Sequence, residues 1–166
     1  TLKRIKSMGC THVWYTGIIR HASTTSYEEY GIPTQHPAIV KGKAGSPYAI
    51  VDYYDVDPDL AENVLDRMQE FEALLSRTSK VGLKTIIDFV PNHVARQYKS
   101  TTKPEGAEDL GENDDTTKNF DTNNNFYYCN GLPFAPSFSL YSEATDTTYF
   151  EQPAKATGND RFDNAP

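Results

Sequence analysis

Cysteine and long apolar stretches are both scarce in this sequence. The 166 residues include only two cysteines, Cys10 and Cys129, which lie far apart and make no disulfide framework. Whether they pair, and in which redox compartment the chain works, therefore stays open. Cys10 lies in an apolar run, and we expect it to pack as a small hydrophobic residue. No stretch approaches the ~20 apolar residues of a membrane-spanning helix, and no signal peptide is recognisable at the first residues.

Basic residues are too few for a partner that carries negative charge. The chain has 16 lysines and arginines against 23 aspartates and glutamates, which gives a formal net charge of -7. Nucleic acids and anionic membranes need a basic face, so the composition argues against both as partners. A neutral ligand or a cation fits this balance better.

The two ends of the sequence show no complete structural element. The opening residues place Leu2, Ile5 and Met8 on one helical face, with Gly9 beyond them as a C-cap. The sequence therefore opens at the end of a helix. The last residues, "RFDNAP", carry no stop signal. We expect the sequence to be a segment of a longer chain.

The strongest helical pattern covers residues 58–81. Asp57 can cap this helix, Pro58 suits its first position, and Gly82 ends it. The apolar positions recur at steps of three or four and form one stripe: Leu60, Val64, Met68, Phe71 and Leu75. We therefore predict one long helix between Asp57 and Gly82.

This helix lies between two predicted strands. The first, "THVWYTGII" (11–19), is rich in β-branched and aromatic residues, and we place its Trp14 in the core. The second, "LKTIIDFV" (83–90), is apolar on both faces, as in a covered parallel sheet. The order gives an α/β fold with a right-handed βαβ unit. Residues 20–47 lack periodicity and predict a long loop.

The character of the sequence changes after about residue 97. An acidic polar tract, "KPEGAEDLGENDDTT", is followed by "FDTNNN" and then by many aromatic residues among prolines and asparagines. A long irregular segment after a parallel strand is usually a functional excursion or a small inserted subdomain. We favour the inserted subdomain and divide the chain into residues 1–97 and 98–166.

The residues best suited to chemistry follow the second strand, in "TIIDFVPNHV" (85–94). Parallel strands deliver functional side chains at their carboxyl ends. Asn92 offers a carbonyl oxygen of the kind that calcium prefers, and His93 can bind a hydroxyl group. Taken singly, Asp88, Asn92 and His93 would more often cap turns or satisfy local hydrogen bonds. Their concentration in six residues favours a functional site.

The same motif, "DFVPNH", resembles the first conserved region of glycoside hydrolase family 13, the α-amylase family. "SPYAIVDYYDVDP" and "FEALLSRTSKVGLKTIIDFVPNH" are similar to the family's sequence around the second barrel helix and third strand. "MGCTHVWYTGI" resembles its second strand, and "FDTNNNFYY" resembles the start of its domain B. The resemblance implies a partial TIM (β/α)8 barrel in residues 1–97. It also implies an irregular, β-leaning and incomplete domain B insertion in residues 98–166.

The resemblance assigns a role to each candidate residue. His93 matches the histidine that hydrogen-bonds the sugar just before the scissile bond, and Tyr48 matches the tyrosine that stacks on that sugar. Asn92 matches a ligand of a calcium ion between the barrel and domain B, so calcium is the expected cofactor. Asp88 corresponds to a carboxylate that organises the site and is not the nucleophile.

Several other polar and aromatic residues permit two interpretations each. For Asp52, Tyr53 and Asp55 we favour hydrogen bonding within the loop and helix start over contact with sugar. The aromatic residues after 126 could form a sugar-stacking platform, but packing beneath loops is their commoner role. A solvated loop is the favoured interpretation for the acids of the polar tract: Glu105, Glu108, Asp109, Glu112, Asp114 and Asp115.

The resemblance implies that the parent protein cleaves or transfers α-linked glucose units, in starch or malto-oligosaccharides, by retaining double displacement. Such chemistry needs two carboxylates ~5–5.5 Å apart. The family places them on the fourth and fifth strands, which we expect to lie in the remainder of the barrel in the same longer chain. This chain alone should therefore not hydrolyse starch.

Two alternatives stay open at the level of sequence. The chain could belong to a non-catalytic relative that uses the barrel for carbohydrate binding or protein contacts, or to an unrelated α/β protein with a chance motif. The bond cleaved, the choice between hydrolysis and transfer, and the cellular location are also open. An extracellular, periplasmic or cell-surface bacterial setting is consistent with starch degradation.

Overall fold

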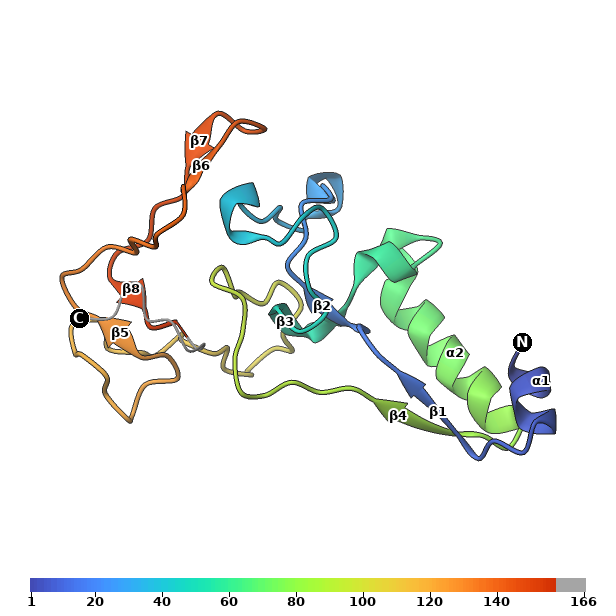
Figure 1. Cartoon of the computed structure of the whole chain (residues 1–166). Coiled ribbons are helices and arrows are strands. Elements are labelled where there is room, and N and C mark those ends of the chain that lie inside the picture. Colours follow the sequence, from blue (N-terminus) through green and yellow to red (C-terminus); the bar gives the residue numbers. More distant parts are fainter. Residues whose placement is uncertain (158–166) are drawn as a thin grey trace.

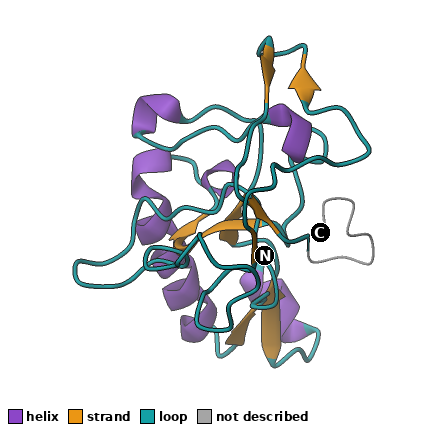
Figure 2. Ribbon diagram, turned by 90° about the vertical axis from the view of Figure 1, so that its left-hand side faces the viewer, coloured by secondary structure: helices purple, strands orange, loops and turns teal. Residues whose placement is uncertain are grey.

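A computed structural model describes residues 1–157, in which loops and turns make up most of the chain (Figure 2). The helices lie with β1 and β4 at one end of the molecule, β2 and β3 lie in the middle, and β5–β8 lie at the other end (Figure 1). The α-helices and strands are α1 Leu2–Ser7, β1 His12–Tyr15, β2 Ile19–His21, β3 Ile50–Val56, α2 Arg67–Lys80, β4 Lys84–Ile87, β5 Tyr128–Cys129, β6 Tyr141–Ser142, β7 Thr147–Thr148 and β8 Ala154–Lys155. No helix in the described residues is long and apolar enough to span a membrane.

The predicted βαβ unit is confirmed. Strands β1 and β4 pair in parallel, with His12 opposite Lys84 and Tyr15 opposite Ile87, and α2 precedes β4 along the chain. Gly82 ends the helix with a positive φ of 76°, which a residue without Cβ adopts at no steric cost. This parallel sheet has two strands in the described part of the chain, so residues 1–157 do not close a barrel.

The predicted start of the helix is wrong by nearly ten residues. Asp57 does act as a cap, but its Oδ1 accepts from the Asp59 amide at 3.0 Å and begins only a short 3-10 turn, Pro58–Leu60. Asn63 caps a second 3-10 turn, Val64–Asp66, and α2 begins at Arg67. Short polar side chains that bind nearby amides offer the backbone an alternative to the helix.

The prediction of a loop over residues 20–47 is partly wrong, because its first two residues belong to a strand of an antiparallel ribbon. Strand β2 pairs with β3, with Ile19 opposite Val56 and His21 opposite Ile50, across two register shifts. The loop between them contains 3-10 turns at Glu28–Tyr30 and Pro37–Ile39. Strand β3 was not predicted because buried Asp52 and Asp55 break the alternation of apolar and polar residues on which strand prediction rests.

Two residues that we placed among apolar neighbours are in fact exposed. Cys10 is exposed, and both it and Cys129 are free thiols, so the two do not pair. Trp14 is 64% exposed. The exposed and half-buried residues alternate along β1, and Tyr15 faces the helix through a hydrogen bond to Thr78. Trp14 therefore projects from the opposite face of the strand.

The last part of the described chain is irregular and contains only two-residue strands. β5 pairs with β8 and β6 with β7, both antiparallel. The β6–β7 hairpin projects from the rest of the molecule (Figures 1 and 2). Cys129, Phe134, Tyr149 and Ala154 form a small core here. The expectation that the aromatic residues after 126 pack beneath loops holds only in part, because four of them are exposed: Tyr127, Phe138, Tyr141 and Phe150. The predicted insertion extends to residue 166, so its residues 158–166 lie outside the described part. The division at residue 97 stays a prediction.

Candidate functional site

The motif after β4 separates into one anchored residue and two exposed ones. The amide of Asp88 donates to the Tyr15 carbonyl at 3.1 Å, which extends the parallel ladder, and Asp88 is half-buried. Asn92 and His93 are both exposed in the loop that follows. His93 Nδ1 lies 2.7 Å from Asn92 Oδ1. Because an amide oxygen only accepts, Nδ1 carries the hydrogen, which leaves Nε2 of a neutral ring as an acceptor.

Tyr48 lies on a neighbouring segment, just before β3. Its side chain is 50% exposed. The loop after β4 packs along the start of β3, since the Ala95 amide donates to the Ile50 carbonyl at 2.8 Å. The hydroxyl of Tyr53 donates to the Val90 carbonyl at 2.5 Å and adds a second link between the two segments. The segments that carry Tyr48 and His93 are therefore neighbours, and both side chains are open to solvent.

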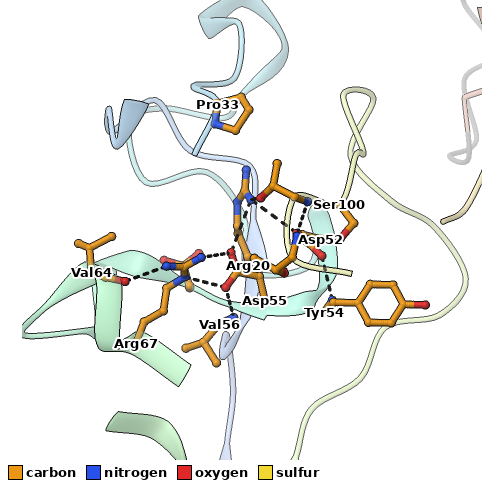
Figure 3. Close-up of polar contacts among 12 residues, drawn as sticks. Arg20, Pro33, Asp52, Tyr54, Asp55, Val56, Val64, Arg67 and Ser100 are labelled. Carbon is orange, nitrogen blue, oxygen red and sulfur yellow. Dashed lines mark hydrogen bonds and ion pairs between the residues drawn. The ribbon is translucent and has the colours of Figure 1, made fainter. Parts of the chain in front are cut away.

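Strand β3, which follows Tyr48, carries two aspartates of a buried cluster of charges that sequence reasoning recognised only in part (Figure 3). Arg67 binds Asp55 through Nε at 2.6 Å and Nη2 at 2.9 Å. Arg20 Nη1 lies 3.6 Å from Asp55 and 3.7 Å from Asp52. The expected hydrogen bonding at the helix start holds for Asp55, which binds the first residue of α2, but Asp52 binds distant segments and both residues lie in strand β3. Arg20 and Arg67 were missed, because no sequence spacing relates an arginine to a partner on another element.

Asp52 connects this cluster to the segment that follows the site loop. Its carboxylate accepts from the Thr101 amide at 2.8 Å and the Tyr54 amide at 2.9 Å, and its side chain is fully buried. Arg20 donates to the hydroxyl of Thr101 at 2.9 Å. The ribbon beneath Tyr48 and the chain beyond His93 are thus held together by buried polar contacts.

His21 anchors the loop that leads to Tyr48. Its Nε2 lies 3.1 Å from the Ala44 carbonyl. Its Nδ1 lies 2.8 Å from Oδ2 of Asp57, an ion-pair contact that is not an aligned hydrogen bond. Burial lowers the pKa of His21, but the Asp57 carboxylate and the Ala44 carbonyl outweigh it and raise the pKa above 6.5. Both ring nitrogens face acceptors, so the protonated ring fits this position best.

Comparison with known proteins now identifies the family. The model of the alpha-amylase catalytic domain matches residues 1–151. The chain belongs to the alpha-amylase family. This excludes a chance motif in an unrelated α/β protein, and it fits a TIM-barrel family whose closed barrel residues 1–157 do not show.

Similar proteins include catalytic and transporter-associated members. Maltase 1 of Drosophila virilis is 35% identical over 67 residues, which are 38% of this chain and 10% of that protein. Maltase A2 of Drosophila melanogaster is 26% identical over 122 residues, 71% of this chain and 17% of that protein. The human amino acid transporter heavy chain SLC3A1 is 37% identical over 51 residues, 31% of this chain and 7% of that protein. The chain thus spans less than a fifth of these relatives, and no solved structure matches it.

The alpha-amylase resemblance implies calcium and assigns Asn92 to it as a ligand. Calcium takes six to eight oxygen ligands, usually including carboxylates. No group of three or more His, Cys, Asp or Glu side chains suited to a metal occurs in residues 1–157. The Oδ1 atom of Asn92 faces the ring of His93. Asn92 therefore offers one oxygen ligand, and calcium stays a prediction.

The acidic tract has a local structural role as well as a solvated face. Glu105, Glu108 and Glu112 are exposed, as the favoured interpretation expected. Asp114, which is half-buried, accepts from the Asn125 and Phe126 amides at 2.7 and 2.9 Å. The tract is therefore folded against the residues that follow it.

Proposed function

We propose that this chain forms part of the sugar site of a glycoside hydrolase that acts on α-linked glucose units. The observation that carries the proposal is the packing of the β4 loop along β3, which brings the segments of Tyr48 and His93 together with both side chains exposed. Membership of the alpha-amylase family and similarity to two maltases support the same substrate class.

In this proposal each side chain acts on the sugar by its own chemistry. The exposed ring of Tyr48 packs on the apolar face of a glucose unit. His93 binds a hydroxyl group through Nε2, because Asn92 occupies Nδ1. Asp88 organises the base of the site from the end of the parallel ladder.

Bond cleavage would require residues from the rest of the barrel. Retaining hydrolysis uses one carboxylate as nucleophile and one as acid, ~5–5.5 Å apart. The family resemblance assigns both to strands other than β1 and β4. We therefore propose that the 166-residue chain binds sugar without hydrolysing it, and that the rest of the barrel supplies the reaction.

A second function, in a non-catalytic relative, is favoured by one specific finding. The similarity to the SLC3A1 heavy chain, whose name assigns it to an amino acid transporter, has an identity as high as that to Maltase 1 over a slightly shorter stretch. In that case the same segments would serve a protein contact, and Tyr48 and His93 would not bind sugar.

Titration of the chain with maltotriose, followed by NMR chemical shifts, tests the proposed function. We expect saturable binding, and we expect Tyr48→Ala and His93→Ala each to weaken it roughly tenfold. Phe150→Ala is the control, since Phe150 is also exposed but lies in the distal part of the chain. Cellotriose, with β-linkages, is the control ligand. A folded chain that shows no response to maltotriose would contradict the proposal that this chain binds sugar by itself.

A further inference from the structure

Arg96 lies three residues after His93 and contacts the distal part of the chain. Its Nη2 donates to the Lys155 carbonyl at 2.6 Å and lies 3.2 Å from Oε1 of Glu151. Its guanidinium carbon lies 3.5 Å from the centre of the Phe134 ring. One planar side chain therefore makes a hydrogen bond, an ion pair and a cation–π contact at once.

The contact is reciprocal. Lys155 Nζ donates back to the Arg96 carbonyl at 2.6 Å, so the main chain and the side chain of Arg96 are both bound by one residue. The Lys155 amide donates to Glu151 Oε1 at 2.7 Å, and the Tyr149 hydroxyl donates to Oε2 at 2.6 Å. Glu151 is thus held in place to receive Arg96.

The neighbouring residue binds a third segment. Gln97 Oε1 accepts from the His36 amide at 2.7 Å, and the ring of His36 packs on Tyr149 with centroids 5.6 Å apart. The loop after β4 is therefore fixed from two sides, immediately beyond the exposed Asn92 and His93. Within residues 1–157, the ring of His93 makes its hydrogen bond to the neighbouring Asn92 and so depends on the position of the loop.

Burial makes this arrangement costly unless the geometry is good. The side chains of Arg96 and Glu151 are only 16% and 9% exposed. Removing charges from water is repaid only when they are closely paired and hydrogen-bonded. Apolar residues would pack equally well at this position. Charged and hydrogen-bonded side chains, in contrast, fix how the loop after β4 lies against residues 149–155.

We propose that Arg96 is a positioning residue, which fixes the loop of Asn92 and His93 by locking it onto residues 149–155. This role rests on the proposed function, because the loop that Arg96 fixes carries His93, the histidine proposed to bind sugar. Lysine cannot replace Arg96 fully, since it lacks the planar fork that reaches Glu151 and the Lys155 carbonyl together.

The first test measures the position of the loop without any ligand. Arg96→Gln and Arg96→Lys are compared with Arg77→Gln, which removes an exposed arginine from α2. We expect Arg96→Gln to shift the His93 ring signals in NMR spectra and to speed exchange of the Ala95 amide about tenfold. Arg96→Lys should have a smaller effect, and Arg77→Gln none. If Arg96→Gln does not fold, Glu151→Gln replaces it, and we expect the same shift of the His93 signals and the same faster exchange of the Ala95 amide.

Unchanged His93 signals and Ala95 exchange in folded Arg96→Gln, with shifts confined to Phe134 and Tyr149, would overturn the proposal. Arg96 would then stabilise the distal core only.

The second test measures maltotriose affinity of the same variants. We expect Arg96→Gln to weaken maltotriose affinity roughly fivefold or more relative to the unaltered chain. The loss in Arg96→Lys should be smaller. If the unaltered chain does not bind maltotriose but Arg96→Gln still displaces His93, the proposed function fails while the positioning role stands. If the unaltered chain binds and Arg96→Gln binds equally well, the positioning role fails and the proposed function stands.

Discussion

At the scale of single residues, the three polar residues after β4 differ: the backbone of Asp88 is anchored, and Asn92 and His93 are exposed. Asp88 continues the hydrogen-bond ladder to Tyr15, whereas Asn92 and His93 face solvent and each other. The separation matches the idea that a strand end supplies a rigid base and the loop beyond it supplies the ligand-binding groups. His21 and Asp55 carry the two clearest predictions at this scale.

We predict that His21 makes the loop before Tyr48 sensitive to pH. The pKa of His21 is raised above 6.5 by Asp57 and the Ala44 carbonyl, despite burial. Its stabilising contribution is therefore complete below pH 6.5 and is lost as pH rises through the folded-state pKa. The melting temperature should therefore fall as pH rises above 6.5, and His21→Gln should remove that slope. His12→Gln, at an exposed histidine, is the control, and an unchanged slope in His21→Gln would disprove the assignment.

Asp55 should be the most costly single charge to remove. It receives two hydrogen bonds from Arg67 and lies 3.6 Å from Arg20, with its side chain almost fully buried. Asp55→Asn leaves two buried guanidinium groups without their shared anion, so unfolding free energy should fall by about 3 kcal/mol. Urea denaturation measures this, with Glu72→Gln on the exposed face of α2 as control. A change no larger than the control would mean that the cluster is not coupled to folding.

At the scale of elements, the loop between β2 and β3 depends on one close approach. Gly45 has a φ of 71°, and a Cβ there would lie 1.7 Å from the Ala22 carbonyl oxygen. Since backbone cannot give way as a side chain can, this loop must move if Gly45 gains a methyl group.

Gly45→Ala should therefore destabilise the chain by more than the positive φ alone. Gly42→Ala is the matched control, because its φ is 66° but nothing lies near its Cβ. We expect Gly42→Ala to cost about 1 kcal/mol and Gly45→Ala at least about 2 kcal/mol more, measured by thermal or urea unfolding. Equal costs would show that the approach to Ala22 is not rigid.

The elements also show what sequence patterns can and cannot predict. The apolar stripe, of which Met68, Phe71 and Leu75 lie in α2, and the apolar run of β4 predicted the βαβ unit, because both are local sequence patterns. The start of α2 depends on competition between Asp57, Asn63 and the helix for the same amides, which periodicity does not measure. Strand β3 could not be predicted from its own residues, because it buries two aspartates whose arginine partners come from other elements.

The candidate site divides in the same way. The motif predicted that Asn92 and His93 begin the loop after a parallel strand, and both residues follow β4 in the structure. It could not predict Arg96 as a link to Glu151, because the two residues are distant in sequence and their pairing depends on the fold of the distal segment. The roles of Tyr48, Asn92 and His93 toward sugar and calcium stay predictions.

At the scale of the whole molecule, the two-stranded parallel sheet and the residues just after it leave several large apolar side chains exposed. Trp14 and Phe89 are 64% and 61% exposed, and Ile86 and Ile87 are also exposed. A full barrel of this family has eight parallel strands, so we expect additional strands to cover these residues in the parent protein. The sheet and the proposed sugar site are then parts of one catalytic domain.

Maltose hydrolysis by the protein encoded by the complete gene tests the central claim most directly. The account predicts release of glucose with retained anomeric configuration, loss of affinity in Tyr48→Ala and His93→Ala, and no release by the 166-residue chain alone. A complete, folded protein that binds no maltose and releases no glucose would contradict it. That result would favour a non-catalytic role of the kind suggested by the similarity to the SLC3A1 heavy chain.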